Sequence, residues 1–320
     1  MNSKSTYNIS HKKVWIAGHN GMVGRAIRRR LEREGCEILT VDKKKIDLTN
    51  QSATDNWIKL KRPEVIFMAA AKVGGIKANT LEKYSFLYDN LMIQNNIINS
   101  ARYISLDKLV FLGSSCIYPK NVTQPIKEDS LLDGKLEPTN EGYALAKIAG
   151  LKLCEYFNDK FNKDFISVMP SNLYGPYDNF DPDKSHVLGS LLRKIYTAKF
   201  QKRKNVEIWG TGIPRREFLY VDDLADALVF LVKNYTNSKP INVGTSKDIS
   251  INELAILISK ILNHDIKLVH NKKMPNGTLL KRLDTSKINK LGWIPAVSLK
   301  DGILKTLDYC KKHNVFEKKK

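Results

Sequence analysis

Short apolar runs alternate with longer amphipathic segments along the first half of the chain. Five runs, each largely apolar on consecutive positions, are predicted as strands: Val14–Ala17, Ile38–Val41, Val65–Ala70, Leu109–Leu112 and Phe165–Met169. Such runs are typical of strands that are buried on both faces of a parallel sheet. Between them, Met22–Arg33 and Tyr143–Phe161 place apolar residues at helical spacing. The alternation predicts βαβ units and an α/β fold with a Rossmann-type, doubly wound parallel sheet.

The second half of the chain is divided by three turn-forming segments rich in Asn, Asp, Pro and Gly. They cover Asn172–Lys184, Trp209–Pro214 and Asn271–Gly277. Helical periodicity recurs between them, at His186–Thr197, Val221–Lys233 and Ser250–Leu262. We therefore predict a Rossmann domain over residues 1–165 and a smaller α/β substrate-binding lobe over residues 166–320. Some segments of the second part are expected to return to the Rossmann sheet.

Composition excludes several other classes of protein. Of the 320 residues, 42% are hydrophobic, which is enough for a large core, yet no apolar stretch is long enough to cross a membrane. The N-terminal segment has no apolar signal sequence, so we expect a soluble, cytoplasmic protein. The four cysteines form no C-x-x-C pair, which predicts reduced thiols and no metal site.

The chain carries a formal net charge of +20. Such an excess suits an anionic ligand: a nucleic acid, an acidic membrane surface or a phosphorylated small molecule. Lysines that only solvate the surface are the simpler explanation for most of it. Because no basic stretch is interleaved with aromatic residues, we expect neither nucleic acid nor membrane as a partner. Strong, salt-dependent retention on DNA would favour the opposite interpretation.

A glycine-rich turn follows the first expected strand and leads into the first expected helix. It comprises Gly18, His19, Asn20, Gly21, Met22, Val23 and Gly24. Glycines let the chain turn sharply and let its backbone approach a pyrophosphate closely. The start of a helix adds free N–H groups and the positive end of a dipole. The position of this turn between strand and helix predicts a dinucleotide-binding site.

The end of the second expected strand gives two conflicting signals about the cofactor. This is where a Rossmann fold recognises the adenine-side ribose. Asp42 can accept hydrogen bonds from a free 2′-hydroxyl, which favours NAD(H). Lys43 and the lysines after it can hold a 2′-phosphate, which favours NADP(H). These residues therefore leave both cofactors open.

Tyr143 and Lys147 stand four residues apart, which places both side chains on one face of a helix. A neighbouring ammonium lowers the pKa of a phenol from its usual value of about 10. The pair can therefore deliver a proton to a carbonyl group that receives a hydride. Another expected strand ends in Gly113-Ser114-Ser115-Cys116, at the sheet edge where doubly wound folds bind ligands. A serine there can hold a substrate carbonyl or simply cap the next turn.

Longer segments of the chain are far more specific than the glycine turn. They are Ala69–Ile76, Gly113–Lys120, Glu137–Lys147, Met169–Pro176, and Trp209–Gly212 with Arg216–Phe218. Together they closely resemble the GDP-L-fucose synthase family, one branch of the extended short-chain dehydrogenases/reductases. The resemblance runs from about Val14 to about Trp293, which is nearly the whole chain.

The resemblance implies an NADP(H)-dependent enzyme that forms a homodimer. Members of the family epimerise C3 and C5 of GDP-4-keto-6-deoxy-mannose and then reduce its C4 ketone. The resemblance implies Ser114, Tyr143 and Lys147 as the reductase triad. It implies Cys116 and His186 as the acid–base pair for epimerisation. A thiol and an imidazole suit that chemistry, because both exchange protons near neutral pH.

The resemblance also assigns residues to the two ligands. For the cofactor it implies the glycine turn, Asp42 and Lys43, and a set at the strand ends: Leu112, Gly113, Ser114, Ser115, Lys147, Pro170, Ser171, Asn172, Leu173 and His186. For the GDP-linked sugar it implies Lys194, Trp209, Arg216 and Asn276. An arginine is apt there because its guanidinium matches diphosphate oxygens. A surface ion pair is the alternative for Arg216.

Three positions depart from the family pattern. Asn20 replaces a frequent arginine, Asp42 is acidic where the family usually is not, and Asn276 stands where relatives often have aspartate. NAD(H) is therefore not excluded. The sugar stays open between a GDP-4-keto-6-deoxy-hexose and the corresponding heptose, and some related enzymes carry out only part of the epimerase–reductase sequence.

Two other classes of protein share some of these motifs. A nucleotide-sugar 4-epimerase or dehydratase would keep the turn and the Tyr–Lys pair. A dehydratase would also need an acidic residue beside the serine, and Ser115-Cys116 offers none. A non-catalytic protein that senses the cofactor would have no reason to keep Ser114 with the Tyr–Lys pair.

Overall fold

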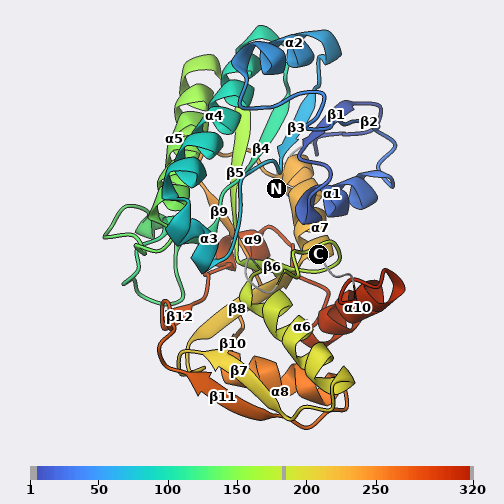
Figure 1. Ribbon diagram of the computed structural model, residues 1–320. Coiled ribbons are helices and arrows are strands. Elements are labelled where there is room, and N and C mark those ends of the chain that lie inside the picture. The colour runs from blue at the N-terminus through green and yellow to red at the C-terminus, as the bar shows by residue number, and fades with distance from the viewer. Residues whose placement is uncertain (1–5, 182–184, 318–320) are drawn as a thin grey trace.

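Six parallel strands form the central sheet of the protein (Figure 1). The computed structural model describes residues 6–181 and 185–317. In spatial order the six strands are β2 (Glu37–Leu39), β1 (Lys13–Ala17), β3 (Val65–Met68), β4 (Lys108–Leu112), β5 (Asp164–Pro170) and β9 (Ile241–Val243). The chain order reverses beside β1, between β2 and β3, so a ligand crevice is expected at the carboxyl ends of these strands. The predicted doubly wound α/β fold is confirmed.

Helices cover both faces of this sheet. One face carries α1 (Met22–Leu31) and α7 (Val221–Asn234); the other carries α2 (Gln51–Lys61), α4 (Lys83–Ser100) and α5 (Glu141–Phe161). Strand β1 shows why the apolar runs are continuous. Val14 and Ile16 pack with the α1–α7 layer, whereas Trp15 and Ala17 pack with the α4–α5 layer. Alternate side chains thus enter opposite cores, and every position must be apolar.

A smaller lobe with its own apolar core follows the sheet at its carboxyl edge (Figure 1). Its strands are β6 (Asn172–Tyr174), β7 (Asn205–Trp209), β8 (Arg215–Tyr220), β10 (Asp248–Ser250), β11 (Lys267–Asn271) and β12 (Leu280–Lys281). Its longer helices are α6 (Val187–Phe200), α8 (Ile251–Ile261) and α10 (Leu299–Lys312). Two short helices, α3 (Ile76–Leu81) and α9 (Ser286–Lys290), lie beside the junction of the two parts.

The structure corrects several sequence-based boundaries. The expected turn Asn172–Lys184 begins with a strand, β6, which is formed by pairing with β8, and Pro182–Lys184 lie outside the described residues. β3 ends at Met68. The Ala69 N–H still donates to Ala17 O, but it also bonds to Phe67 O, two residues back, where the chain turns. Among the described residues, no helix is both long and apolar enough to cross a lipid bilayer.

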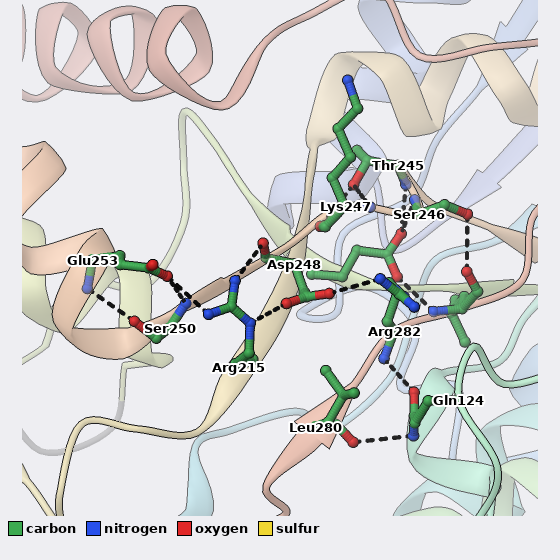
Figure 2. A network of polar contacts seen from close by, with 12 residues as sticks. Gln124, Arg215, Thr245, Ser246, Lys247, Asp248, Ser250, Glu253, Leu280 and Arg282 are labelled. Atoms are coloured by element: carbon green, nitrogen blue, oxygen red, sulfur yellow. Dashed lines mark hydrogen bonds and ion pairs between the residues drawn. The ribbon is translucent and has the colours of Figure 1, made fainter.

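A polar network joins the two parts of the chain (Figure 2). Gln124 donates its amide N–H to Leu280 O at 3.1 Å and accepts the Arg282 N–H at 2.9 Å. Arg282 and Arg215 in turn form ion pairs with Asp248. The loop that follows the end of β4 is therefore fixed to β12 on both sides of Lys281.

Candidate active site

The glycine turn joins β1 to α1 at the reversal of the sheet order. Gly18 has a φ of +87°, and a Cβ added there would lie 2.6 Å from the Ala70 nitrogen. A Cβ on Gly24 would lie 2.6 Å from His19 Cα, whereas one on Gly21 would meet nothing closer than Gly18 O, at 3.5 Å. Packing therefore requires the two outer glycines. The middle glycine leaves its backbone open to a ligand.

The start of α1 offers free hydrogen-bond donors. Gly21 is its N-cap, no side chain caps the helix, and its first turn has no acidic residue. The N–H groups of Met22 and Val23 and the positive end of the helix dipole are therefore available to an anion. His19 is buried, and its Nδ1 has no hydrogen-bond partner among the described residues. These donors fit the pyrophosphate of a dinucleotide.

The residues expected to recognise the ribose lie beside this turn. Asn20 Nδ2 donates a 2.6 Å hydrogen bond to Asp42 Oδ1, and His19 Nε2 lies 3.5 Å from the same oxygen. Burial lowers the pKa of His19 despite this carboxylate, so its imidazole is neutral at pH 7. Asp42 and Lys43 are both exposed. The side chain that favours NAD(H) and the one that favours NADP(H) are therefore both accessible to a bound ribose.

The structure brings Tyr143 and Lys147 together with the end of β4. Lys147 is 4% exposed, and its Nζ donates a 2.8 Å hydrogen bond to Leu112 O. The same Nζ lies 5.7 Å from the centroid of the Tyr143 ring. Burial lowers the pKa of Lys147 to about 8 and raises that of Tyr143, with Cys116 adding to the latter effect. Tyr143 is therefore protonated at neutral pH and can serve as a proton donor.

Cys116 lies in a short 3-10 helix, η2 (Ser115–Ile117), directly after β4. The Cys116 N–H donates to Ser114 Oγ at 3.2 Å, and Ser115 is buried. Asn140 Nδ2 lies 3.2 Å from the Cys116 sulfur, and Lys281 Nζ lies 3.9 Å from it. Sequence reasoning missed both contacts. Asn140 belongs to a motif that it did single out, whereas Lys281 gave no local signal.

Glycine at position 113 lets the strand end approach its neighbour. A Cβ there would collide with the Met169 side chain, and Gly113 N donates to Val168 O at 2.9 Å. This packing holds β4 and β5 together at the edge where the expected catalytic residues lie.

His186 is the N-cap of α6, on the other side of the junction between the sheet and the lobe. Its side chain is accessible to solvent, yet the surrounding protein desolvates the imidazole and lowers its pKa. Among the described residues it makes no hydrogen bond or ion pair with Cys116 or Tyr143. The structure therefore leaves its expected pairing with Cys116 as a prediction.

The residues expected around the nicotinamide connect β5 to β6: Pro170, Ser171, Asn172 and Leu173. Ser171 N donates to Val243 O at 3.0 Å, and Asn172 Nδ2 donates to Glu217 O at 2.7 Å. The Ser171 hydroxyl is buried and has no partner among the described residues. This segment is thus held by its backbone and by Asn172, while one polar group stays available to a ligand.

The four residues expected to bind the nucleotide sugar lie in the smaller lobe. Lys194 contacts Trp209, and Asn276 contacts the turn after Trp209. Lys194 Nζ lies 5.8 Å from the Trp209 ring centroid and donates to Glu207 O at 3.2 Å. Burial lowers the pKa of Lys194. Asn276 Oδ1 accepts hydrogen bonds from Thr211 N and Oγ1, at 2.8 and 3.0 Å. Asn276 therefore shapes the turn that follows Trp209.

Arg216 has the properties of an anion-binding group. It forms no ion pair with another described residue, and burial lowers the pKa of its guanidinium. Its charge nevertheless interacts with Cys116 and Glu137. A Cβ on Gly277 would lie 3.1 Å from Arg216 Nη2, so the turn after Asn276 closes over this side chain. A desolvated cation of this kind suits a diphosphate. The described residues form no ion pair with it, so binding of the diphosphate stays the prediction for Arg216.

A glycine turn at the sheet reversal, with a Tyr–Lys pair and a serine at the end of β4, is typical of a nucleotide-dependent dehydrogenase/reductase. Comparisons with known proteins agree with this class. Residues 14–244 match the NAD dependent epimerase/dehydratase family. The chain belongs to this family and, within it, to the GDP-L-fucose synthases and their relatives.

Individual relatives cover nearly the whole chain. It is 45% identical to a GDP-L-fucose synthase of Sinorhizobium fredii, over 94% of this chain and 96% of that protein. A GDP-6-OMe-4-keto-L-xylo-heptose reductase from Campylobacter jejuni is 35% identical, with a TM-score of 0.90 over 97% of this chain and 100% of that one. A GDP-mannoheptose C4 reductase from the same organism, solved with NADP bound, is 36% identical, with a TM-score of 0.85 over 94% and 98%.

Proposed function

We propose that the chain epimerises C3 and C5 of a GDP-linked 4-keto-6-deoxy sugar and then reduces its C4 ketone with NADPH. The observation that carries the proposal is the position of Tyr143, Lys147 and Cys116 at the end of β4. Lys147 Nζ donates to Leu112 O at 2.8 Å and lies 5.7 Å from the Tyr143 ring centroid, and Cys116 follows the same strand end in η2. The 45% identical GDP-L-fucose synthase supports the reaction, and the NADP-bound reductase supports the cofactor.

The two parts of the chain divide the binding of the ligands in this proposal. Residues 1–165 hold the cofactor through the glycine turn and the Asp42–Lys43 region. Residues 166–320 mainly hold the GDP-linked sugar through Lys194, Trp209 and Arg216. A cytoplasmic location, where NADPH and nucleotide sugars are available, completes the proposal.

Cys116 and His186 carry out the epimerisation. One of them removes a proton from a carbon next to the ketone, and the electron pair moves onto the ketone oxygen. The other returns a proton to the opposite face of the same carbon, which restores the ketone. A neutral imidazole and a thiol both exchange protons near neutral pH. Repeating the cycle on the other side of the ketone inverts the second centre.

Tyr143, Lys147 and Ser114 carry out the reduction. When bound, NADPH supplies the hydride that C4 receives. Tyr143 donates its phenolic proton to the ketone oxygen, which becomes the C4 hydroxyl, and Ser114 holds that oxygen in place. Lys147 stabilises the phenolate that Tyr143 becomes. Arg216 binds the diphosphate, so the sugar ring is held against these groups.

NADPH consumption tests the reaction. We expect oxidation of NADPH with GDP-4-keto-6-deoxy-mannose or with its heptose counterpart, and loss of this oxidation in Tyr143→Phe. The exposed Tyr103 provides the matched control, since Tyr103→Phe removes a hydroxyl far from the site. Consumption of neither NADPH nor NADH with either sugar would contradict the proposed function.

The heptose is a second candidate substrate. The 35% and 36% identical reductases with GDP-heptose names favour it, whereas the GDP-L-fucose synthases favour the hexose. NMR analysis of the products in deuterated water distinguishes them. Incorporation of deuterium at C3 and C5 counts the epimerised centres. Cys116→Ser should suppress that incorporation while it leaves cofactor binding intact.

We also propose a homodimer that is formed through α4 and α5. These two helices pack side by side and leave large apolar side chains exposed: Tyr84, Tyr88, Leu145 and Tyr156. An apolar face of this kind is typical of a subunit interface. Sedimentation should give a dimer for the native chain and a monomer for Leu145→Glu. A monomeric native chain would contradict this part of the proposal.

A further inference from the structure

The helix that carries Tyr143 and Lys147 begins with an asparagine that does not cap it. Asn140 is the N-cap of α5, but its side chain makes no capping hydrogen bond. An asparagine at this position normally accepts a hydrogen bond from the first turn and stabilises the helix. Asn50 does so at the start of α2, where it accepts from Ala53 N at 2.9 Å. At α5 the helix forgoes this contact.

The Asn140 side chain faces Cys116 instead. Its Nδ2 lies 3.2 Å from the sulfur, and its Oδ1 is buried with no hydrogen-bond partner among the described residues. Asn140 thus lacks the hydrogen bond that would stabilise its helix, and its buried Oδ1 lacks a partner, so both features cost folding stability. Such losses of stability are expected at functional sites, where a side chain serves the chemistry before it serves its own helix.

A second donor reaches the same sulfur from a distant part of the chain. Lys281 Nζ lies 3.9 Å from Cys116 Sγ. Both neighbours of Lys281 are fixed by Gln124, which contacts Leu280 O and Arg282 N (Figure 2). The lysine therefore comes from a firmly held strand, β12, and not from a free loop. An amide N–H and an ammonium thus converge on one sulfur atom.

Two donors around a sulfur atom favour one of its protonation states. A thiol is a weak acceptor, whereas a thiolate carries a full negative charge and accepts strongly. We propose that Asn140, with Lys281 as a second donor, positions the Cys116 sulfur as a thiolate for proton removal from the sugar. This inference rests on the proposed function. It adds a positioning residue that couples the start of the reductase helix to the epimerisation step.

Alkylation by iodoacetamide tests the inference without any sugar. The rate of modification at Cys116, followed by peptide mass mapping across pH, reports the thiolate fraction. Asn140→Asp keeps the size of the side chain and its capping ability, but it replaces the donor with a carboxylate, whose charge also disfavours a thiolate. We expect modification roughly tenfold slower at pH 7, which corresponds to a profile displaced by about one pH unit. Asn140→Ser removes the amide donor without adding a charge, and it should slow the modification in the same direction. Lys281→Met should displace the profile in the same direction.

Matched variants away from the site control for general effects. Asn50→Asp makes the same change at an N-cap that does cap its helix, and Lys272→Met removes an exposed lysine outside the site. Both should alkylate like the native chain. If Asn140→Asp also retains the native profile while it remains folded by circular dichroism, the inference is wrong. Asn140→Ser, a neutral capping residue, serves if the aspartate variant fails to fold.

A second measurement separates positioning from folding. With a substrate that the native enzyme turns over, Asn140→Asp should lower deuterium uptake at C3 and C5 more than it lowers NADPH binding. Equal losses in both would indicate a structural role and overturn the inference. Because alkylation needs no sugar, a native chain that ignores GDP-sugars would contradict the proposed function alone.

Discussion

At the scale of single residues, burial sets the chemistry of Lys147. Its pKa is lowered from 10.5 to about 8, so the side chain is a cation below pH 8 and an uncharged amine above it. Only the cation stabilises the phenolate that Tyr143 becomes after it donates its proton. The proton-delivery pair should therefore weaken as pH rises, while the fold around it is retained.

Reduction of the C4 ketone should accordingly slow above about pH 8, where Lys147 loses its proton. Lys147→Arg keeps its charge at that pH, so its alkaline limb should lie more than about one pH unit higher. Its maximal rate should be lower, because a guanidinium does not reproduce the contact of Nζ with Leu112 O. Measuring kcat/KM for NADPH oxidation across pH tests this. Identical alkaline limbs would show that another group titrates.

Part of the site could be predicted from single residues, and part could not. The four-residue spacing of Tyr143 and Lys147 and the position of Ser114 after a strand already indicate a shared edge. The two contacts of Cys116 carry no such signal. An asparagine at a helix start is expected to cap that helix. Lys281 reaches the site through long-range pairing, of β12 with β8 and of residues 280–284 with residues 124–126.

At the scale of elements, burial on both faces made the central strands predictable. β1 is apolar at every position except its first residue, because its side chains enter two cores. The short strands of the smaller lobe were not predicted. β6, β10 and β12 have two or three residues each, and pairing with β8 defines them. Segments of that length have no periodicity to detect.

The glycine turn gives a prediction at this scale, because its glycines have different reasons to be small. Gly24→Ala should destabilise the fold by about 1–3 kcal/mol, since the new Cβ would overlap His19 Cα. Gly21→Ala should fold normally, because its Cβ meets only ordinary contacts. It should instead weaken NADPH binding by filling the space for the pyrophosphate. Urea unfolding measures the loss of stability, and fluorescence titration measures NADPH binding. A native NADPH affinity in Gly21→Ala would show that this turn does not hold the pyrophosphate.

At the scale of the whole molecule, the site needs the sheet and the smaller lobe in a fixed arrangement. Arg216 lies in β8 of the lobe, whereas Cys116 and Lys147 belong to the Rossmann part. Glu217, the next residue in β8, is fully buried and accepts three backbone N–H groups. They come from Thr245 and Ser246, which follow β9, and from Leu283, which follows β12. One carboxylate thus holds β8 to the edge of the main sheet.

Replacing that carboxylate with an amide should loosen the whole molecule. In Glu217→Gln one oxygen becomes an NH2 group that must face a backbone N–H, which should cost about 1–3 kcal/mol of unfolding free energy. Glu32→Gln, at an exposed i,i+4 pair with Arg28, should cost less than about 0.5 kcal/mol. Burial raises the pKa of Glu217, so the folded chain keeps this proton at pH values where the unfolded chain releases it. Native stability should therefore fall as pH rises through that window, and Glu217→Gln should lose this slope. Denaturant unfolding of both variants at several pH values measures the loss of unfolding free energy and its pH dependence. An equal loss of unfolding free energy in Glu217→Gln and Glu32→Gln would show that Glu217 does not join the two parts.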